Sequence, residues 1–264
     1  MNSDMMKVIS LGLGVQSTAM YMMSSTGRIE RADYAIFSDP GAELPETYEV
    51  LKRLQLWRED NDGIPILITR EKNLLKDILN SQNSSGHRWA SIPAFTNNNS
   101  GIMKRQCTSE YKIRPIVKKI REIYGLKRKY RMPMTQVWLG ISMDEIERMK
   151  ISSLRRVEYY YPLIEERLSR SDCIKVFKEF NFKVPPKSSC IFCPYHGDRQ
   201  WKELKYELPN EWDTVVKVDK AIRDSSNKGI TEKIYLHRSC VSIDDVQFAD
   251  QQELFMCEEG YCGL

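Results

Sequence analysis

Short apolar runs alternate, in the first half of the chain, with segments whose apolar positions follow helical spacing. The runs rich in β-branched and aromatic residues predict strands at 7–11, 32–37, 64–69 and 136–139. Residues 16–23 and 45–57 predict helices between them. This alternation predicts an α/β fold with a doubly wound, mostly parallel, Rossmann-like sheet. Ligands of such sheets bind beyond the carboxyl ends of the strands.

The chain changes character at residue 157, where prolines, short helical segments and a cysteine pair begin. We therefore expect an α/β domain over 1–156. A smaller, irregular or helical cysteine-containing region is expected over 157–264, ending in a mobile tail with two thiols.

Composition excludes two broad classes of protein. Hydrophobic residues make up 41% and charged residues 29%, which is typical of a globular chain and not of a disordered one. No apolar run has the length of a membrane span, so no membrane partner is expected. The seven cysteines, in a chain whose start does not resemble a signal peptide, indicate a reducing, cytoplasmic compartment. There they serve metal or redox chemistry more often than disulfides.

The net charge of +4 hides two opposite blocks. Residues 112–131 contain nine basic side chains and one acid, whereas residues 239–264 contain six acids and no Lys or Arg. The basic block, with tyrosines interleaved, predicts a surface for nucleic acid. Its isoleucines at helical spacing equally predict an ordinary solvated helix face, and the two interpretations are compatible.

A glycine-rich loop joins the first predicted strand to the first predicted helix. Glycines there turn backbone N–H groups toward an anion, and the helix N-terminus adds partial positive charge. A plain strand-to-helix turn is the alternative. The candidate anion-binding residues of this loop are Ser10, Gly12, Gly14, Gln16, Ser17 and Thr18.

Two other strand ends carry polar candidates. Asp39 follows the second strand, where a carboxylate can accept from a nucleotide or hold a metal, although a turn or N-cap aspartate is equally typical. Gly140 and Arg148 follow the fourth strand, and Arg148 could clamp a phosphate or sulfate. A surface helix arginine is the alternative.

The cysteines suggest a metal centre and a reactive tail. Cys190 and Cys193 form a C-x-x-C pair that can reach one metal ion from a tight turn, with Cys107 and Cys173 as further candidate ligands. Two more thiols, Cys257 and Cys262, lie on the acidic tail. They predict a redox or persulfide-carrying arm, or else are incidental.

Taken in order, these residues resemble the phosphoadenosine phosphosulfate (PAPS) reductase family, within the PP-loop superfamily of adenine nucleotide α-hydrolases and ATP pyrophosphatases. The tail Glu-Gly-Tyr-Cys-Gly-Leu is similar to the one that carries the catalytic cysteine of PAPS reductases. Earlier segments resemble, in turn, the PP-loop, the Asp-Thr-Gly and Pro-Glu-Thr segment, the cysteine, lysine and proline segment, the anion-contacting strand end and the Pro-Leu motif: 12–18, 37–48, 107–115, 140–148 and 161–163.

The resemblance implies an enzyme of sulfur metabolism that binds an adenine nucleotide, either an adenylyl sulfate or ATP with Mg²⁺. Cys262 is then the catalytic thiol, with Cys257 or a thioredoxin-like protein as reductant, and Arg105 and Lys112 face the substrate anion. It also implies a [4Fe–4S] cluster, with zinc as the alternative, on Cys107 and the C-x-x-C pair. Because Cys107 is followed by Thr108, the cluster has either an open iron or Cys173 as fourth ligand.

One departure leaves the reaction open. The ATP-cleaving members carry an aspartate where this chain has Gln16, which favours binding of a preformed adenylyl sulfate. The following Ser17 and Thr18 resemble the ATP-cleaving members, and the basic block favours ATP-dependent insertion of sulfur into tRNA or DNA from a sulfur donor. A non-enzymatic metal-cysteine protein that binds nucleic acid is the third hypothesis.

Overall fold

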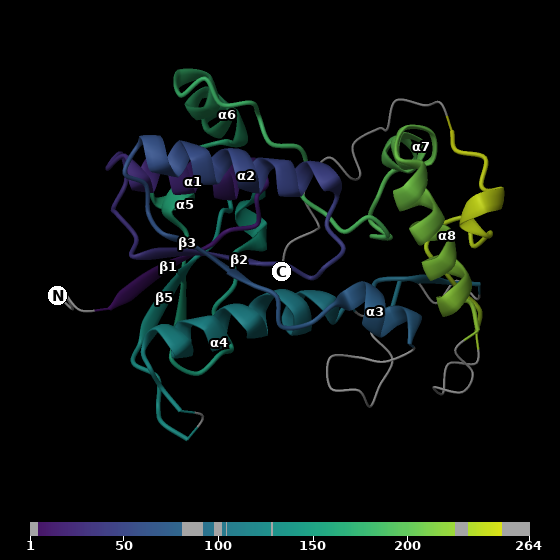
Figure 1. Ribbon diagram of the computed structural model, residues 1–264, viewed down its shortest axis with the longest axis horizontal. Coiled ribbons are helices and arrows are strands. Elements are labelled where there is room, and N and C mark those ends of the chain that lie inside the picture. The colour runs from purple at the N-terminus through teal and green to yellow at the C-terminus, as the bar shows by residue number, and fades with distance from the viewer. Residues whose placement is uncertain are drawn as a thin grey trace. The chain divides into compact units, whose positions relative to one another are not determined.

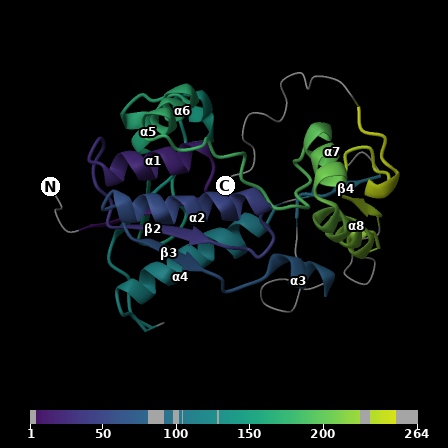
Figure 2. The same cartoon turned by 45° about the horizontal axis from the view of Figure 1, so that its top comes forward.

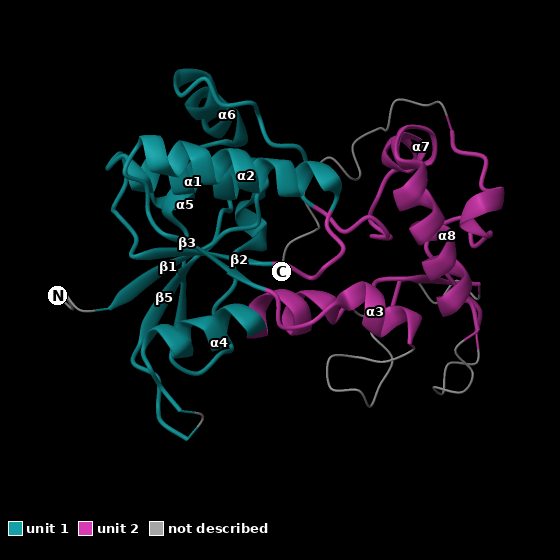
Figure 3. Ribbon diagram, in the orientation of Figure 1, with its two compact units in different colours: residues 1–38, 44–69, 115–188 teal, residues 39–43, 70–114, 189–264 magenta. Residues whose placement is uncertain are grey.

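The structure is a computed structural model that describes residues 5–80, 92–97, 102–103, 105–127, 129–224 and 232–249 (Figure 1). The chain forms two compact units, shown in teal and magenta in Figure 3. Unit 1 comprises 1–38, 44–69 and 115–188, and unit 2 comprises 39–43, 70–114 and 189–264. Both units draw on residues from either side of position 156, and the domain boundary expected there stays a prediction.

Unit 1 is built on a five-stranded parallel sheet with the order β3-β2-β1-β5-β6. This confirms the predicted α/β class, and each of the four predicted strands overlaps a strand of the sheet. The strands are β1 (Met6–Ser10), β2 (Tyr34–Ser38), β3 (Ile66–Thr69), β5 (Thr135–Trp138) and β6 (Val157–Tyr160). Strand β6 was not predicted, because its four residues carry little alternation and it is defined by pairing with β5.

Helices cover both faces of this sheet, with α4 on one side and the other helices of unit 1 on the opposite side (Figure 2). Helix α1 is almost entirely buried because it lies between the sheet and α6. Side chains from α1, α2, α6 and the strands form one continuous apolar core. The helices of unit 1 are α1 (Val15–Ser25), α2 (Pro45–Asp60), α4 (Arg114–Ile123), α5 (Pro162–Glu165) and α6 (Arg170–Glu179), with a 3₁₀ segment η2 (Met143–Arg148).

Unit 2 consists of short helices and a two-stranded antiparallel sheet. Its helices α7 and α8 pack on each other, and α8 also contacts α3. The elements are α3 (Leu74–Leu79), β4 (Phe95–Thr96), the π-helix η1 (Thr108–Ile113), α7 (Asp198–Glu207), α8 (Pro209–Ile222), β7 (Ile234–Tyr235) and the 3₁₀ segment η4 (Ile243–Asp245). None of the helices among the described residues could cross a membrane.

Candidate functional site

The strand order reverses at β1, whose carboxyl end lies beside that of β5. The chain leaves β1 toward β2 on one side, whereas β5 pairs on the other side of β1. In parallel sheets this reversal is where ligands bind, because the two connections diverge and leave a gap. The glycine loop after β1 and Gly140 after β5 both lie at this point.

The loop presents the N-terminus of α1 without a side-chain cap. Gly12 is exposed, and Gly14 is the N-cap residue in an extended conformation. Between them Leu13 has a left-handed φ of 61° and a fully buried side chain, so packing holds a backbone conformation that leucine disfavours. The first N–H groups of a helix have no intrahelical partner and carry partial positive charge. The loop can therefore receive an anion.

Gly140 approaches the first turn of α1 so closely that only glycine fits. A Cβ on Gly140 would lie 2.7 Å from the backbone nitrogen of Ser17 and 2.8 Å from its Cα. Contacts of this length to backbone atoms cannot be relieved by a side-chain rotation. The end of β5 thus forms one wall of the loop.

Replacement of Gly140 by alanine is expected to lower the free energy of unfolding by about 1–3 kcal/mol, as overpacking does, and to weaken anion binding by displacing Ser17. Denaturant unfolding measures the first effect. Gly12→Ala is the matched control, because its Cβ would meet only the Ser17 hydroxyl at an ordinary 3.6 Å. Equal stability of the two variants would contradict the close approach.

Gln16 is held by an arginine that the sequence did not single out. The Nη1 of Arg170 donates to Oε1 of Gln16 over 3.2 Å. Arg170 begins α6, and Ser169 and Asp172 form a capping box around this start. The N–H of Arg170 donates to the Asp144 carboxylate. The sequence did not predict this contact because Arg170 and Gln16 are 154 positions apart.

Arg148, predicted as an anion clamp, forms an ion pair with Glu145. Its Nη1 lies 2.6 Å from Oε1 of Glu145, and both side chains are largely buried. Burial raises the pKa of Glu145 against the opposing influence of Arg148 and Arg170. Both arginines therefore lie near one carboxylate, and the anion-binding role of Arg148 stays a prediction.

Asp39 belongs to unit 2 and is engaged within its own turn. Its carboxylate accepts the N–H of Gly41 over 2.7 Å and the Nε of Arg70 over 2.8 Å, and the side chain is 4% exposed. These contacts are typical of the turn aspartate that was the alternative interpretation. A nucleotide contact by Asp39 stays a prediction.

The C-x-x-C pair is attached to the segment that follows Asp39. Cys190 forms a β-bridge with Glu43, and the N–H of Ile191 donates to the carbonyl of Ala42 over 2.8 Å. The N–H of Cys193 donates to the carbonyl of Cys190 over 3.0 Å, which closes a tight turn. Both thiols therefore belong to one well-defined turn of unit 2.

Lys112 brings Cys107 into the same neighbourhood. Its Nζ lies 2.7 Å from Oε1 of Glu43, a carboxylate whose side chain is fully buried. Burial opposes the charge on Lys112, but Glu43, Cys190 and Cys107 outweigh it and raise the pKa of the amine. Lys112 is thus paired with a carboxylate beside two of the predicted ligand cysteines. Its contact with a substrate anion is untested.

Arg105, the other residue predicted near the substrate anion, lies in the same unit. Its guanidinium lies 5.8 Å from the ring centroid of Tyr195, just after the C-x-x-C pair. Arg105 also opposes the effect of burial, which raises the pKa of Cys107.

The fourth proposed ligand, Cys173, has a different environment. It lies on α6 in the apolar core of unit 1 with no exposed surface, and burial raises its pKa to about 12. Among the described residues no three His, Cys, Asp or Glu side chains are grouped as metal ligands. The thiols of Cys107, Cys190 and Cys193 nevertheless fit a thiophilic metal by their chemistry. The tail cysteines, Cys257 and Cys262, lie outside the described residues.

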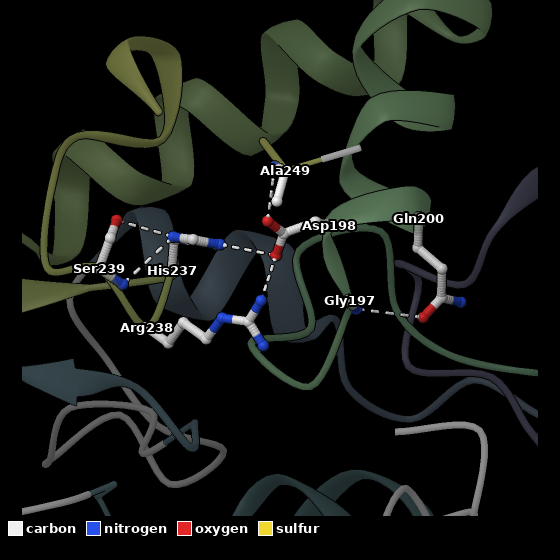
Figure 4. Close-up of polar contacts among 7 residues, drawn as sticks. All are labelled: Gly197, Asp198, Gln200, His237, Arg238, Ser239 and Ala249. Atoms are coloured by element: carbon white, nitrogen blue, oxygen red, sulfur yellow. Dashed lines mark hydrogen bonds and ion pairs between the residues drawn. The ribbon is translucent and has the colours of Figure 1, made fainter. Parts of the chain in front are cut away.

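A polar network centred on Asp198 was missed by sequence reasoning (Figure 4). The carboxylate, at the start of α7, accepts from Nε2 of His237 at 3.3 Å, Nη2 of Arg238 at 2.8 Å and the N–H of Ala249 at 2.9 Å. The Nδ1 of His237 accepts the N–H of Ser239, which leaves the ring proton on Nε2. The network ties α7 to two later segments of unit 2.

This network predicts acid sensitivity. Burial lowers the pKa of His237 in the folded chain. Below the ordinary histidine value of about 6.5 the unfolded chain binds a proton that the folded chain resists, so stability falls as the pH decreases from about 7 toward about 5. Unfolding curves across this range measure the slope, and His237→Gln is expected to flatten it. An unchanged slope in that variant would assign the acid sensitivity to another group.

Similarity to known proteins is found among solved structures. No family model matches the chain, and no curated protein matches it. Among solved structures the chain is similar to the phosphoadenylyl-sulfate (PAPS) reductase from Candida auris in its phosphate complex. The identity is 11%, the TM-score is 0.41, and the match covers 69% of this chain and 74% of that chain.

Proposed function

We propose that this chain is an enzyme of sulfur metabolism that binds an adenylyl sulfate and reduces it with its own thiols. The observation that carries the nucleotide assignment is the uncapped start of α1 beside Gly140, at the point where the sheet order reverses. The reaction type is inferred from the cysteine pattern and from the resemblance to PAPS reductases.

The proposed chemistry proceeds by two thiol attacks. The Cys262 thiolate attacks the sulfate sulfur, an S–S bond forms, and the S–O bond to the nucleotide phosphate breaks. A second thiolate, from Cys257 or a thioredoxin-like protein, then attacks the Sγ of Cys262. A disulfide forms and sulfite leaves with the electron pair of the S–S bond. Backbone N–H groups of the loop stabilise the departing phosphate.

Cys107, Cys190 and Cys193 would hold an iron–sulfur cluster or a zinc ion. Such a group, when bound, links two separate segments of unit 2 and adds positive charge beside their thiolates. Lys112 lies near Cys107 and Cys190, and its positive charge is shared between their thiolates and the carboxylate of Glu43.

The direct test is sulfite release by anaerobically purified protein from adenylyl sulfates with and without the 3′-phosphate, in the presence of thioredoxin. Turnover supports the reductase type. If neither nucleotide reacts, but ATP is cleaved when tRNA or DNA is added, ATP-dependent sulfur insertion is supported. If the protein retains nucleic acid but turns over no nucleotide, it is the non-enzymatic protein.

One observation favours the second candidate. Helix α4 buries Ile116 and Ile120, and basic side chains line its exposed face. Tyr130, just beyond the helix, is 53% exposed, and Lys129 lies 5.5 Å from its ring. An exposed ring beside positive charge suits an unpaired base.

Charge reversal at Lys118, Lys127 and Lys129 is expected to weaken binding of single-stranded RNA or DNA at least tenfold and to reduce its salt dependence. Filter binding at several salt concentrations measures both effects. The control is reversal of the half-buried Lys202 and the exposed Lys217 and Lys220 in unit 2, which changes the charge equally elsewhere. Equal losses in both triple variants would identify α4 as a plain solvated face.

A further inference from the structure

We propose that Arg170 is the residue that selects the substrate anion, acting from α6 on the loop that begins α1. This inference rests on the proposed function and deepens it. It identifies the preferred ligand as an adenylyl sulfate bound by an arginine, and not ATP bound through Mg²⁺.

The position of Arg170 is fixed from several sides. The capping box of α6 involves Ser169 and Asp172, so the backbone at residue 170 is constrained. The N–H of Arg170 donates to the Asp144 carboxylate, which also accepts from the Ser142 hydroxyl at 3.3 Å. The guanidinium then reaches Gln16, the second residue of α1.

The guanidinium has donors to spare for an anion. It carries five N–H groups, and among the described residues Gln16 accepts from one of its terminal nitrogens over 3.2 Å. Arg170 is exposed, so the remaining N–H groups can bind a phosphate or sulfate in the bidentate geometry that guanidinium favours. The uncapped N–H groups of α1 lie in the same part of unit 1.

The same contact disfavours a divalent cation. Mg²⁺ in nucleotide sites is held by one or two carboxylates together with substrate phosphates. Position 16 offers a neutral amide whose oxygen is already engaged by a cation. Two carboxylates near Arg170 already have partners, since Asp144 accepts the Arg170 N–H and Glu145 pairs with Arg148. A metal ion brought here would be repelled by Arg170 and would find no free carboxylate among these described residues.

The selection follows from the charge that each ligand carries. An adenylyl sulfate has separate phosphate and sulfate charges that arginine and backbone N–H groups can neutralise. ATP in solution carries more charge on three adjacent phosphates and normally arrives as its Mg²⁺ complex. Gln16 and Arg170 therefore act together, because the amide orients the guanidinium and gives up the metal-binding oxygen that a carboxylate would supply.

The test is calorimetric titration of the full chain with adenosine 5′-phosphosulfate and with ATP, each in Mg²⁺ and in EDTA. For the wild type we expect phosphosulfate affinity to be the same in both buffers and to exceed that of ATP. Arg170→Gln is expected to lose at least tenfold in phosphosulfate affinity, as for a charge-assisted hydrogen bond. Arg170→Lys keeps the positive charge but loses the bidentate geometry of the guanidinium. Its phosphosulfate affinity is expected to lie between those of the wild type and Arg170→Gln.

Arg155→Gln is the matched control, since Arg155 is exposed in unit 1 and the change removes the same charge. It is expected to bind as the wild type does. The double variant Gln16→Asp with Arg170→Gln is expected to acquire Mg²⁺-dependent nucleotide binding. Thermal unfolding of each variant checks that it is folded.

Three results would overturn the role of Arg170 and leave the proposed function standing. They are a Mg²⁺ requirement in the wild type, tighter binding of ATP than of the phosphosulfate, or wild-type affinity in a folded Arg170→Gln variant. If the wild type binds no adenine nucleotide in either buffer, the proposed nucleotide site fails and Arg170 with it. Sulfite release that persists with unchanged KM in Arg170→Gln would retain the proposed function and discard the selection by Arg170.

Discussion

Replacement of Cys262 by serine is expected to abolish sulfite release while leaving nucleotide binding intact. The serine hydroxyl is a far weaker nucleophile at neutral pH, and oxygen cannot form the S–S bond on which the second step depends. The measurement is sulfite release together with mass spectrometry of the intact chain after a single turnover without reductant. The wild type is expected to gain one SO₃ group if the resolving thiol is external, or to lose two hydrogens as a disulfide if Cys257 resolves the intermediate. The variant is expected to show neither change.

Two other cysteine variants serve as a control and as a test of the resolving thiol. Cys240→Ser is the control, because Cys240 is a partly buried thiol that donates to the Thr96 carbonyl and has no proposed role. It is expected to retain activity. Cys257→Ser separates the two reductants, since loss of activity that thioredoxin restores assigns Cys257 as the resolving thiol. Full activity of Cys262→Ser would exclude the tail nucleophile.

Loss of the metal is the expected result of replacing either cysteine of the C-x-x-C turn by serine. Thiolates bind iron and zinc, and a serine hydroxyl does not replace them at neutral pH. Iron, sulfide and zinc analysis of anaerobically purified Cys190→Ser and Cys193→Ser is expected to show stoichiometric loss relative to the wild type. Absorption near 400 nm separates a cluster from zinc.

Cys173→Ala is the control that decides the fourth ligand. Cys173 lies in the apolar core of unit 1, so its replacement is expected to lower stability slightly and to leave the metal content unchanged. A metal content that falls as it does in Cys190→Ser would restore Cys173 to the ligand set. Retention of metal by all three variants would remove the thiol site altogether.

Local sequence patterns were sufficient for the sheet but not for its edge. Four strands were predictable because each is a short apolar run with glycine or a turn sequence at one end, a signal contained in neighbouring residues. Strand β6 was not, since Val157–Tyr160 is a strand through its pairing with β5. A similar limit applies to Cys173, whose sequence neighbours do not reveal that it packs in a core.

In the candidate site, too, local features were predictable and contacts between distant residues were not. The glycine loop at the start of α1 could be located from the chain alone, because glycines between a strand and a helix have local consequences. The contact of Arg170 with Gln16 could not, since the two residues are 154 positions apart. Nor could the pairing of Lys112 with the buried carboxylate of Glu43, since these residues are far apart in the sequence.

By itself the sequence determined the α/β class, the position of the glycine-rich loop and the spacing of the thiols. Each depends on residue type and on short-range periodicity, which can be identified in the sequence without knowledge of the fold. Only the tertiary structure decided which charge meets which partner: Arg170 with Gln16, Arg148 with Glu145, Asp39 with Arg70. The physical reason is that electrostatic contacts depend on distance in space, which the path of the chain sets and the order of its residues does not display.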